Sequence, residues 1–127
     1  MLTELKKFQK EDHFAIAKWR SVGHSPPPRD VNEYLRYIVN TCTANLIQAA
    51  EQESNPAKLK KILNNSLKSL RAAEYTTAQQ EYIYEVFLRL SYITGVNFRH
   101  QLNTWLHGTF MSFFMAIMPV QNRPFPA

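Results

Sequence analysis

Apolar side chains recur every three or four residues along most of this chain, and no segment alternates between apolar and polar positions. The first spacing is typical of amphipathic α-helices, and strict alternation is typical of half-buried strands. The pattern predicts long helices over about 31–52, 56–70, 78–94 and 98–118, after a shorter amphipathic opening. We therefore expect an all-α fold: an up-down bundle of about four to five helices with a short N-terminal helix or helices packed across it.

The opening segment has a clear end. Its pattern allows a break near Lys10 to Asp12, after which Asp12 is expected to cap a second short helix. Gly23 and the run Ser25-Pro26-Pro27-Pro28 then stop helix formation, because proline lacks an N–H group and restricts the residue before it. We expect residues 24–29 to form a stiff connector of the polyproline type.

Capping residues mark where the longer helices begin. Asp30 with Glu33, and Thr77 with Gln80, have the spacing of a capping box, in which two side chains satisfy free N–H groups reciprocally. Asn55 is followed directly by a proline, and this pair predicts a helix start with the asparagine as cap. Each predicted helix thus begins where its apolar stripe begins.

The helix ends and the last helix can be predicted in the same way. Gly95 is well placed to end one helix in a left-handed conformation, and Asn97 is expected to cap the next. Gly108 interrupts that last helix at a cost of about 1 kcal/mol relative to alanine, so a break or a bend is expected there. Residues 119–127 contain prolines and show no periodicity, which predicts an irregular tail.

Length and composition indicate a single globular domain. The chain has 127 residues, of which 45% are hydrophobic and 20% charged, close to the averages for soluble domains. This length suits one core, so we expect residues 1–127 to form one domain. The most hydrophobic run, residues 109–120, is about 12 residues long, well below the ~20 that a helix needs to cross a bilayer.

The single cysteine and the N-terminus favour the cytoplasm. Cys42 has no second cysteine to pair with, which fits a reducing compartment. It lies one turn from apolar residues on either side, so we expect a buried and unreactive thiol. Glu4, Lys6 and Lys7 stand where a signal peptide would need an apolar stretch.

No motif in the chain points to catalysis, a cofactor or a metal. The nucleophile and phosphate-loop patterns GxSxG, GxGxxG and GxxxxGK[ST] do not occur. His100 and His107 lie two helical turns apart, too far to share one ion, so no metal site is expected. Glu81 and Glu85 lie one turn apart but lack the histidine that di-iron bundles add. An enzyme of unknown class stays an alternative only if these four side chains gather in a pocket.

The formal charge of +5 is unevenly distributed along the chain. Basic and acidic segments alternate, and the most basic helix is the one after Asn55. Its side chains could contact phosphates without sequence preference, although that helix carries no aromatic residue for base stacking. A solvated face, or a partner for the acidic helix before it, explains the lysines more simply. Nucleic-acid binding is therefore unlikely from the sequence and is kept as an alternative, through Lys58, Lys60, Lys61, Lys68 and Arg71.

The last helix carries more aromatic and methionine side chains than one side of a small bundle needs. A helix that is apolar all round must be covered all round, either by its own chain or by another. We predict a small protein-interaction domain, of the adaptor, inhibitor or immunity type, that binds a protein partner or forms a homodimer. The residues expected to make that contact are Trp105, Phe110, Met111, Phe113, Phe114 and Met115.

The order of several short motifs resembles a known family. The opening Leu5-Lys6-Lys7-Phe8, the proline-rich gap, and the ending Leu102-Asn103-x-Trp105-Leu106-x-Gly108 are similar to an uncharacterised bacterial family of small all-helical domains. The resemblance covers most of the chain as far as Gly108, and the segment beyond departs from it. It implies a helical fold and no particular activity.

Overall fold

The computed structural model describes the backbone of residues 1–117 and the side chains of residues 1–108. Within this part every regular element is helical, so the predicted all-α class is confirmed. The elements in chain order are α1 (Leu2–Lys10), α2 (Ile16–Ser21), α3 (Arg29–Glu51), α4 (Pro56–Lys68), the short 3₁₀ helix η1 (Ala72–Glu74), α5 (Thr77–Thr94) and α6 (Arg99–Ile117).

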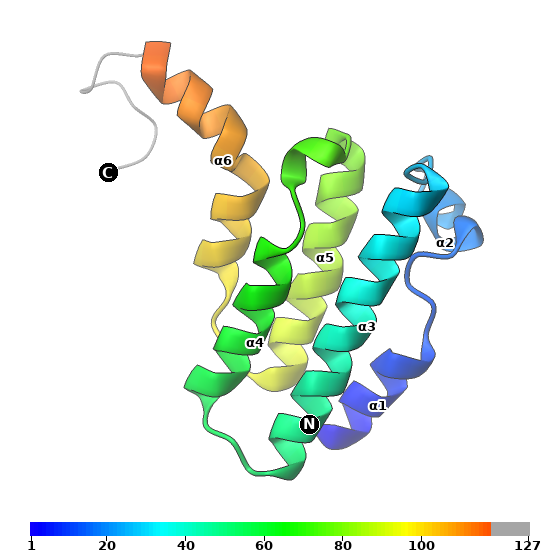
Figure 1. The fold of residues 1–127 in the computed structure, drawn as a ribbon, viewed down its shortest axis with the longest axis vertical. Coiled ribbons are helices and arrows are strands. Elements are labelled where there is room, and N and C mark those ends of the chain that lie inside the picture. The colour runs from blue at the N-terminus through cyan, green and yellow to red at the C-terminus, as the bar shows by residue number, and fades with distance from the viewer. Residues whose placement is uncertain (118–127) are drawn as a thin grey trace.

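The four long helices form the predicted up-down bundle. Figure 1 shows α3, α4, α5 and α6 running alternately in opposite directions, with η1 joining the ends of α4 and α5. α4 contacts α3, α5 and α6, and α5 also contacts α6. The N-terminal helix α1 packs against α3 and α5, so it covers the side of the bundle away from α6.

The core is continuous from α1 to the first half of α6. Its largest fully buried side chains include three phenylalanines and a tryptophan near the N-terminal end of the chain and in α5, together with leucines from every long helix. Among the described residues, each polar residue that is buried as a whole makes a side-chain hydrogen bond. Trp19 Nε1 donates to Asn32 Oδ1 at 3.0 Å, and Asn32 Nδ2 donates to the carbonyl of Phe14 at 2.8 Å. These bonds fix α2 and the preceding loop on α3.

Asp12 does not cap α2, so that prediction is wrong. The helix begins at Ile16 with Ala15 in the cap position and no side-chain cap. The carboxylate of Asp12 instead accepts a hydrogen bond from Arg36 of α3 at 2.8 Å. An ion pair with the neighbouring helix has replaced the local capping bond.

Two of the predicted caps are confirmed. The side chain of Asn55 accepts a hydrogen bond from the N–H of Lys58 at 2.9 Å, and Pro56 is the first residue of α4. Gly95 ends α5 with φ of 70°, in the left-handed region where glycine is favoured.

The α3 cap is predicted wrongly, since α3 begins at Arg29, after the cap residue Pro28, which leaves Asp30 inside the first turn. Glu33 then pairs with Arg36 at 3.1 Å instead of completing a capping box. Because the helix starts early, the non-helical connector covers residues 24–28.

The caps of α5 and α6 are each displaced by one residue. A capping box does open α5, but Thr76 and Gln79 form it in place of the predicted Thr77 and Gln80. In α6 the N–H of Leu102 donates to the carbonyl of Phe98, so Phe98, not Asn97, occupies the cap position.

Of the two outcomes expected at Gly108, the helix does not break but continues to Ile117, and Figure 1 shows its final turns tilted relative to its first half. Figure 1 shows the final turns of α6 extending past the ends of α4 and α5. The predicted tail, residues 119–127, lies outside the described residues.

Candidate binding groove

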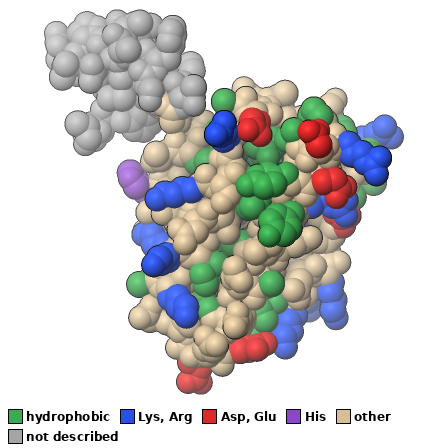
Figure 2. All heavy atoms as spheres, viewed as in Figure 1, with side chains coloured by type: hydrophobic (Ala, Val, Ile, Leu, Met, Phe, Trp, Pro, Cys, Tyr) green, Lys and Arg blue, Asp and Glu red, His purple; other side chains and the backbone are tan. Residues whose placement is uncertain are grey.

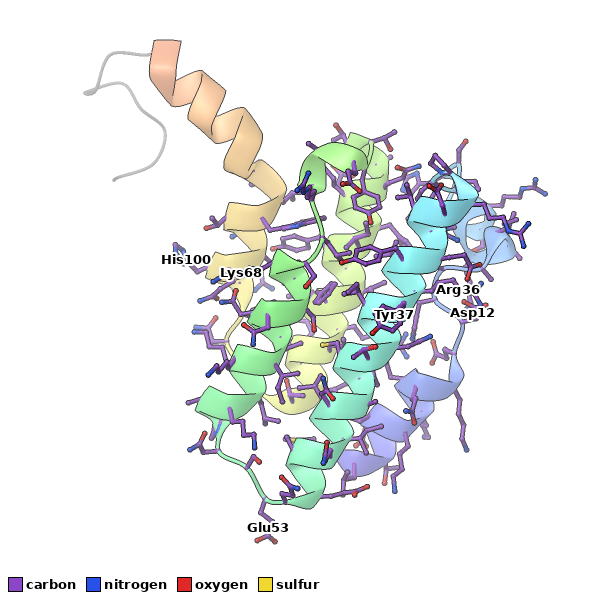
Figure 3. All side chains as sticks on the ribbon, in the orientation of Figure 1. Asp12, Arg36, Tyr37, Glu53, Lys68 and His100 are labelled. Carbon is purple, nitrogen blue, oxygen red and sulfur yellow. The ribbon has the colours of Figure 1, made fainter. Side chains whose placement is uncertain are left out.

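A groove of about 330 Å³ runs between α4 and α6 on the surface of the bundle. It is the candidate site because it brings together an apolar floor, an aromatic wall and several polar side chains. Figure 3 shows Lys68 and His100, one from each helix, on this same flank. The groove is lined by Asn64, Leu67 and Lys68 of α4 and by His100, Gln101, Thr104 and Trp105 of α6.

Helical periodicity explains why these side chains meet. On α6, Phe98 and Leu102 are buried in the core. Gln101, Thr104 and Trp105 follow at the spacing of one helical turn, so they share the adjacent face, which is turned toward α4. On α4, Leu67 is the last buried leucine of the core-facing stripe and forms the floor of the groove.

Trp105 forms one wall and holds the groove in shape. Its side chain is partly buried, and its Nε1 donates to the carbonyl of Leu70 at 2.8 Å. Leu70 lies just after the end of α4, where backbone carbonyls lack helical partners. This hydrogen bond therefore ties α6 to the segment that follows α4.

Gln101 carries an unusual buried oxygen. Its side-chain Oε1 is shielded from solvent and has no hydrogen-bond partner, and among the described residues it is the one buried side-chain nitrogen or oxygen in that condition. Buried polar atoms normally have a partner, and leaving one without costs about 1–3 kcal/mol. A residue that lines the groove thus holds, just beneath the surface, a hydrogen-bond acceptor that no described residue satisfies.

The charge around the groove is positive. Lys68 and His100 are both exposed, and no aspartate or glutamate is among the lining residues. Nothing in the lining neutralises the lysine, so the groove favours an anionic group at its rim.

The predicted partner-binding residues are described only in part. Trp105 does line the groove, although its indole N–H is already used within the chain. The side chains of the other five lie outside the described residues, and their role stays a prediction: Phe110, Met111, Phe113, Phe114 and Met115. Sequence reasoning missed Asn64, Gln101 and Thr104. The only sequence signal was polar residues one turn apart beside a tryptophan.

The basic residues after Asn55 do not form one cluster in the groove. Of the predicted set, only Lys68 is a lining residue. Lys58, Lys61 and Arg71 are exposed and Lys60 is half-buried. Figure 2 shows separate basic side chains along the side of the molecule on which α4 and α6 lie.

The four side chains named for the enzyme alternative do not gather in one pocket. Glu81 and Glu85 of α5 and His107 of α6 are exposed, and none of them lines the groove with His100. Cys42 is buried, and burial raises the pKa of its thiol to about 11, which keeps it in the unreactive protonated form.

The described residues hold neither a cluster of metal ligands nor a helix that could cross a bilayer. Among them, no three histidine, cysteine or acidic side chains lie close enough to hold a metal ion. In the same part of the chain, no helix has the length and apolar character required to span a bilayer.

Fold and groove together define a class: a small all-α bundle with a solvent-facing groove between two of its helices. Within that class the chain belongs to the DUF4844 family, a domain of unknown function, whose family model matches residues 1–110. The predicted resemblance to an uncharacterised helical family is thereby confirmed, and the match stops close to Gly108, as expected. No curated protein matches the chain.

A solved structure supports the same fold. The crystal structure of a DUF3571 family protein from Acinetobacter baumannii is similar to this chain with a TM-score of 0.76 and 22% sequence identity. The similarity covers 90% of this chain and 94% of the other. At this level of identity it bears on the fold alone.

Proposed function

We propose that this protein is an interaction domain that binds another protein chain through the α4–α6 groove and the adjoining second half of α6. Adaptor, inhibitor and immunity proteins act in this way, and we propose the cytoplasm as its location. One observation carries the proposal. α6 leads directly from the groove into a continuing helix, and the chain has no charged residue between Arg99 and Arg123.

The physical reason is the cost of exposing such a helix. Helices that are apolar on all sides are covered by protein or lipid on all sides. The ribbon of α6 continues past the end of α4, the helix that packs beside its first half (Figure 1). A partner seated on the groove and on this extension would cover apolar surface and remove it from water.

Site-specific photo-crosslinking in the native host tests this proposal. A photoreactive phenylalanine analogue at Thr104, an exposed groove residue, should give covalent adducts of higher mass. The matched control places the same analogue at Lys7, exposed on α1 away from the groove, and should give none. Light scattering of the purified protein shows whether the adduct partner is a second copy. Equal adducts from both positions, or none from either, would contradict the proposal.

One observation favours a second candidate, sequence-independent nucleic-acid binding. Tyr34 and Tyr37 of α3 are 46% and 63% exposed, and Figure 2 shows hydrophobic side chains exposed on the same face as several basic ones. Tyr34 donates a hydrogen bond to the carbonyl of Ser69, the neighbour of Lys68. Proteins that bind single-stranded nucleic acid stack bases on exposed aromatic rings and hold the phosphates with nearby basic side chains. Binding of a labelled single-stranded oligonucleotide should then weaken steeply with added salt, and no binding at low salt removes this candidate.

A further inference from the structure

We infer that the α4–α6 groove recognises an acidic polypeptide segment. In this inference a carboxylate of the segment meets Lys68 and His100, a backbone N–H meets the free carbonyl of Gln101, and an apolar side chain rests on Leu67 and Trp105. The inference rests on the proposed function, because it names the chemistry of the partner at the same groove.

The first step concerns the hydrogen-bond acceptor. Gln101 Oε1 has no hydrogen-bond partner among the described residues, and an acceptor can be satisfied only by a donor. The torsion before a glutamine amide is broad and turns easily, so the oxygen can be directed into the groove that Gln101 lines. A polypeptide offers a backbone N–H at nearly every residue, which makes it the simplest source of that donor.

The second step concerns charge. Lys68 is the last residue of α4 and His100 lies in the first turn of α6, and both are exposed at the rim of the groove. No acidic residue lines the groove, and none of the ion pairs within the described residues involves Lys68. A lysine that is not neutralised by its own chain is free to pair with a carboxylate of the partner.

The third step concerns shape and the apolar floor. The groove holds about 330 Å³, at the lower end of the range of about 300–1,000 Å³ for small-molecule sites. It lies at the surface between two helices, as grooves that accept a peptide segment do. Its floor is Leu67 and its wall is the ring of Trp105, which together suit one large apolar side chain.

These features favour a polypeptide over a nucleic acid in this groove. A sugar–phosphate backbone would pair with the lysine but offers few N–H donors for the Gln101 oxygen. It would also leave the apolar floor without a matching group. An acidic segment offers a carboxylate for the lysine, a backbone N–H for the Gln101 carbonyl and an apolar side chain for the floor.

Selection from a random 12-residue peptide library displayed on phage tests the inference. The full-length protein is immobilised and the retained peptides are sequenced. Aspartate or glutamate within a few residues of a large apolar residue should be enriched over the unselected library. Neutral or basic peptides, or no enrichment at all, would overturn the inference.

Three variants then test the residues, with the most enriched peptide titrated while tryptophan fluorescence is recorded. Lys68→Gln should weaken binding about two- to fivefold, whereas Lys61→Gln, exposed on the same helix outside the groove, should not change it. Gln101→Leu should weaken binding about tenfold while the melting temperature stays equal or rises. If Gln101 only stabilised the fold, Gln101→Leu would lower the melting temperature and leave the affinity for the peptide unchanged.

The outcomes separate this inference from the function on which it rests. If Thr104 gives crosslinks but the selected peptides show no acidic preference, the interaction domain stands and the acidic partner is wrong. If neither experiment gives a signal, both are wrong. A light-scattering mass that doubles in the wild type and falls in Lys68→Gln identifies a second copy as the occupant and overturns the inference of an acidic segment from another protein.

Discussion

Two opposite sides of the molecule each contain a tryptophan and a glutamine. On one side these residues are buried and fully hydrogen-bonded, and on the other they are not. In the N-terminal docking region, where α1, α2 and residues 24–28 pack against α3 and α5, Trp19 is fully buried and Gln79 is hydrogen-bonded at both ends of its amide. In the groove, Trp105 is only partly buried and Gln101 has an unpaired carbonyl. In the docking region both residues have their hydrogen-bond partners within the chain, whereas in the groove the carbonyl oxygen of Gln101 lacks one.

The completeness of the docking region is visible in its aromatic contacts. The rings of Phe8 and His13 stack with centroids 3.9 Å apart, and those of Trp19 and Tyr82 lie 4.8 Å apart. Tyr82 also donates a hydrogen bond to the carbonyl of His13 at 2.6 Å. We infer that these contacts stabilise the fold and that a partner binds on the opposite side, at the α4–α6 groove.

The largest expected effect separates the two tryptophans. Trp19→Ala removes a fully buried ring and leaves Asn32 Oδ1 without its donor, so the free energy of unfolding should fall by about 3–5 kcal/mol. Trp105→Ala, at a half-buried position, should cost about 1–2 kcal/mol. Urea unfolding followed by circular dichroism measures both. Equal losses would remove the distinction between the two regions.

The two glutamines should respond with opposite signs. Gln79→Leu leaves the N–H of Thr76 and the carbonyl of Ser25 without their partner, and should destabilise the fold by about 1–2 kcal/mol. Gln101→Leu removes an acceptor that was never paired, and should stabilise the fold by about 1 kcal/mol. The same urea experiment applies. A loss in both variants would mean that Gln101 is paired in solution.

Helix periodicity was predictable because it follows from burial once per turn, a property of the chain alone. The capping residue of a helix was predictable only where the sequence offers a single candidate. Asn55 before a proline has no competitor, whereas the run Thr76-Thr77-Ala78-Gln79-Gln80 offers two capping boxes one residue apart, and tertiary contacts select the first. Gln80 then donates to the carbonyl of Tyr75 instead.

The groove was not predictable, because an unpaired atom is a property of the packed structure. Nothing in the sequence around Gln101 says that its amide lacks a partner in the neighbouring helix. Asp12 illustrates the same limit, since its pairing with Arg36 depends on the docking of the N-terminal region on α3. Local patterns establish the elements, and contacts between elements establish the site.

Acid pH should weaken the docking region. Burial lowers the pKa of His13 below its ordinary value of 6.5, so the folded state favours the neutral ring. The unfolded chain then binds protons more readily, and stability should fall as the pH drops below 6.5 toward the lowered folded value. Unfolding free energies between pH 7.5 and pH 5 measure this. His13→Gln should flatten the profile; an unchanged profile in this variant would contradict the assignment.

The smallest expected effect compares two cations. Arg89 donates to both carboxylate oxygens of Glu11, at 2.7 and 3.0 Å, and lies 5.1 Å from the centre of the Phe8 ring, but it is 49% exposed. Arg89→Gln should therefore cost only about 0.5–1 kcal/mol at low salt, and less as salt screens the pair. Its hydrogen bonds hold the pKa of Glu11 below 4.5, so this contribution is present above that pH and is lost as the pH falls below it.

Lys68→Gln is the matched change in the groove, and it should alter stability by less than about 0.5 kcal/mol because the lysine pairs with no carboxylate among the described residues. Urea unfolding at two salt concentrations measures both variants. A cost for Lys68→Gln as large as that for Arg89→Gln would show that Lys68 is already paired within the chain. Lys68 would then be unavailable to a carboxylate of a partner, and its charge would be neutralised within the chain as that of Arg89 is in the docking region.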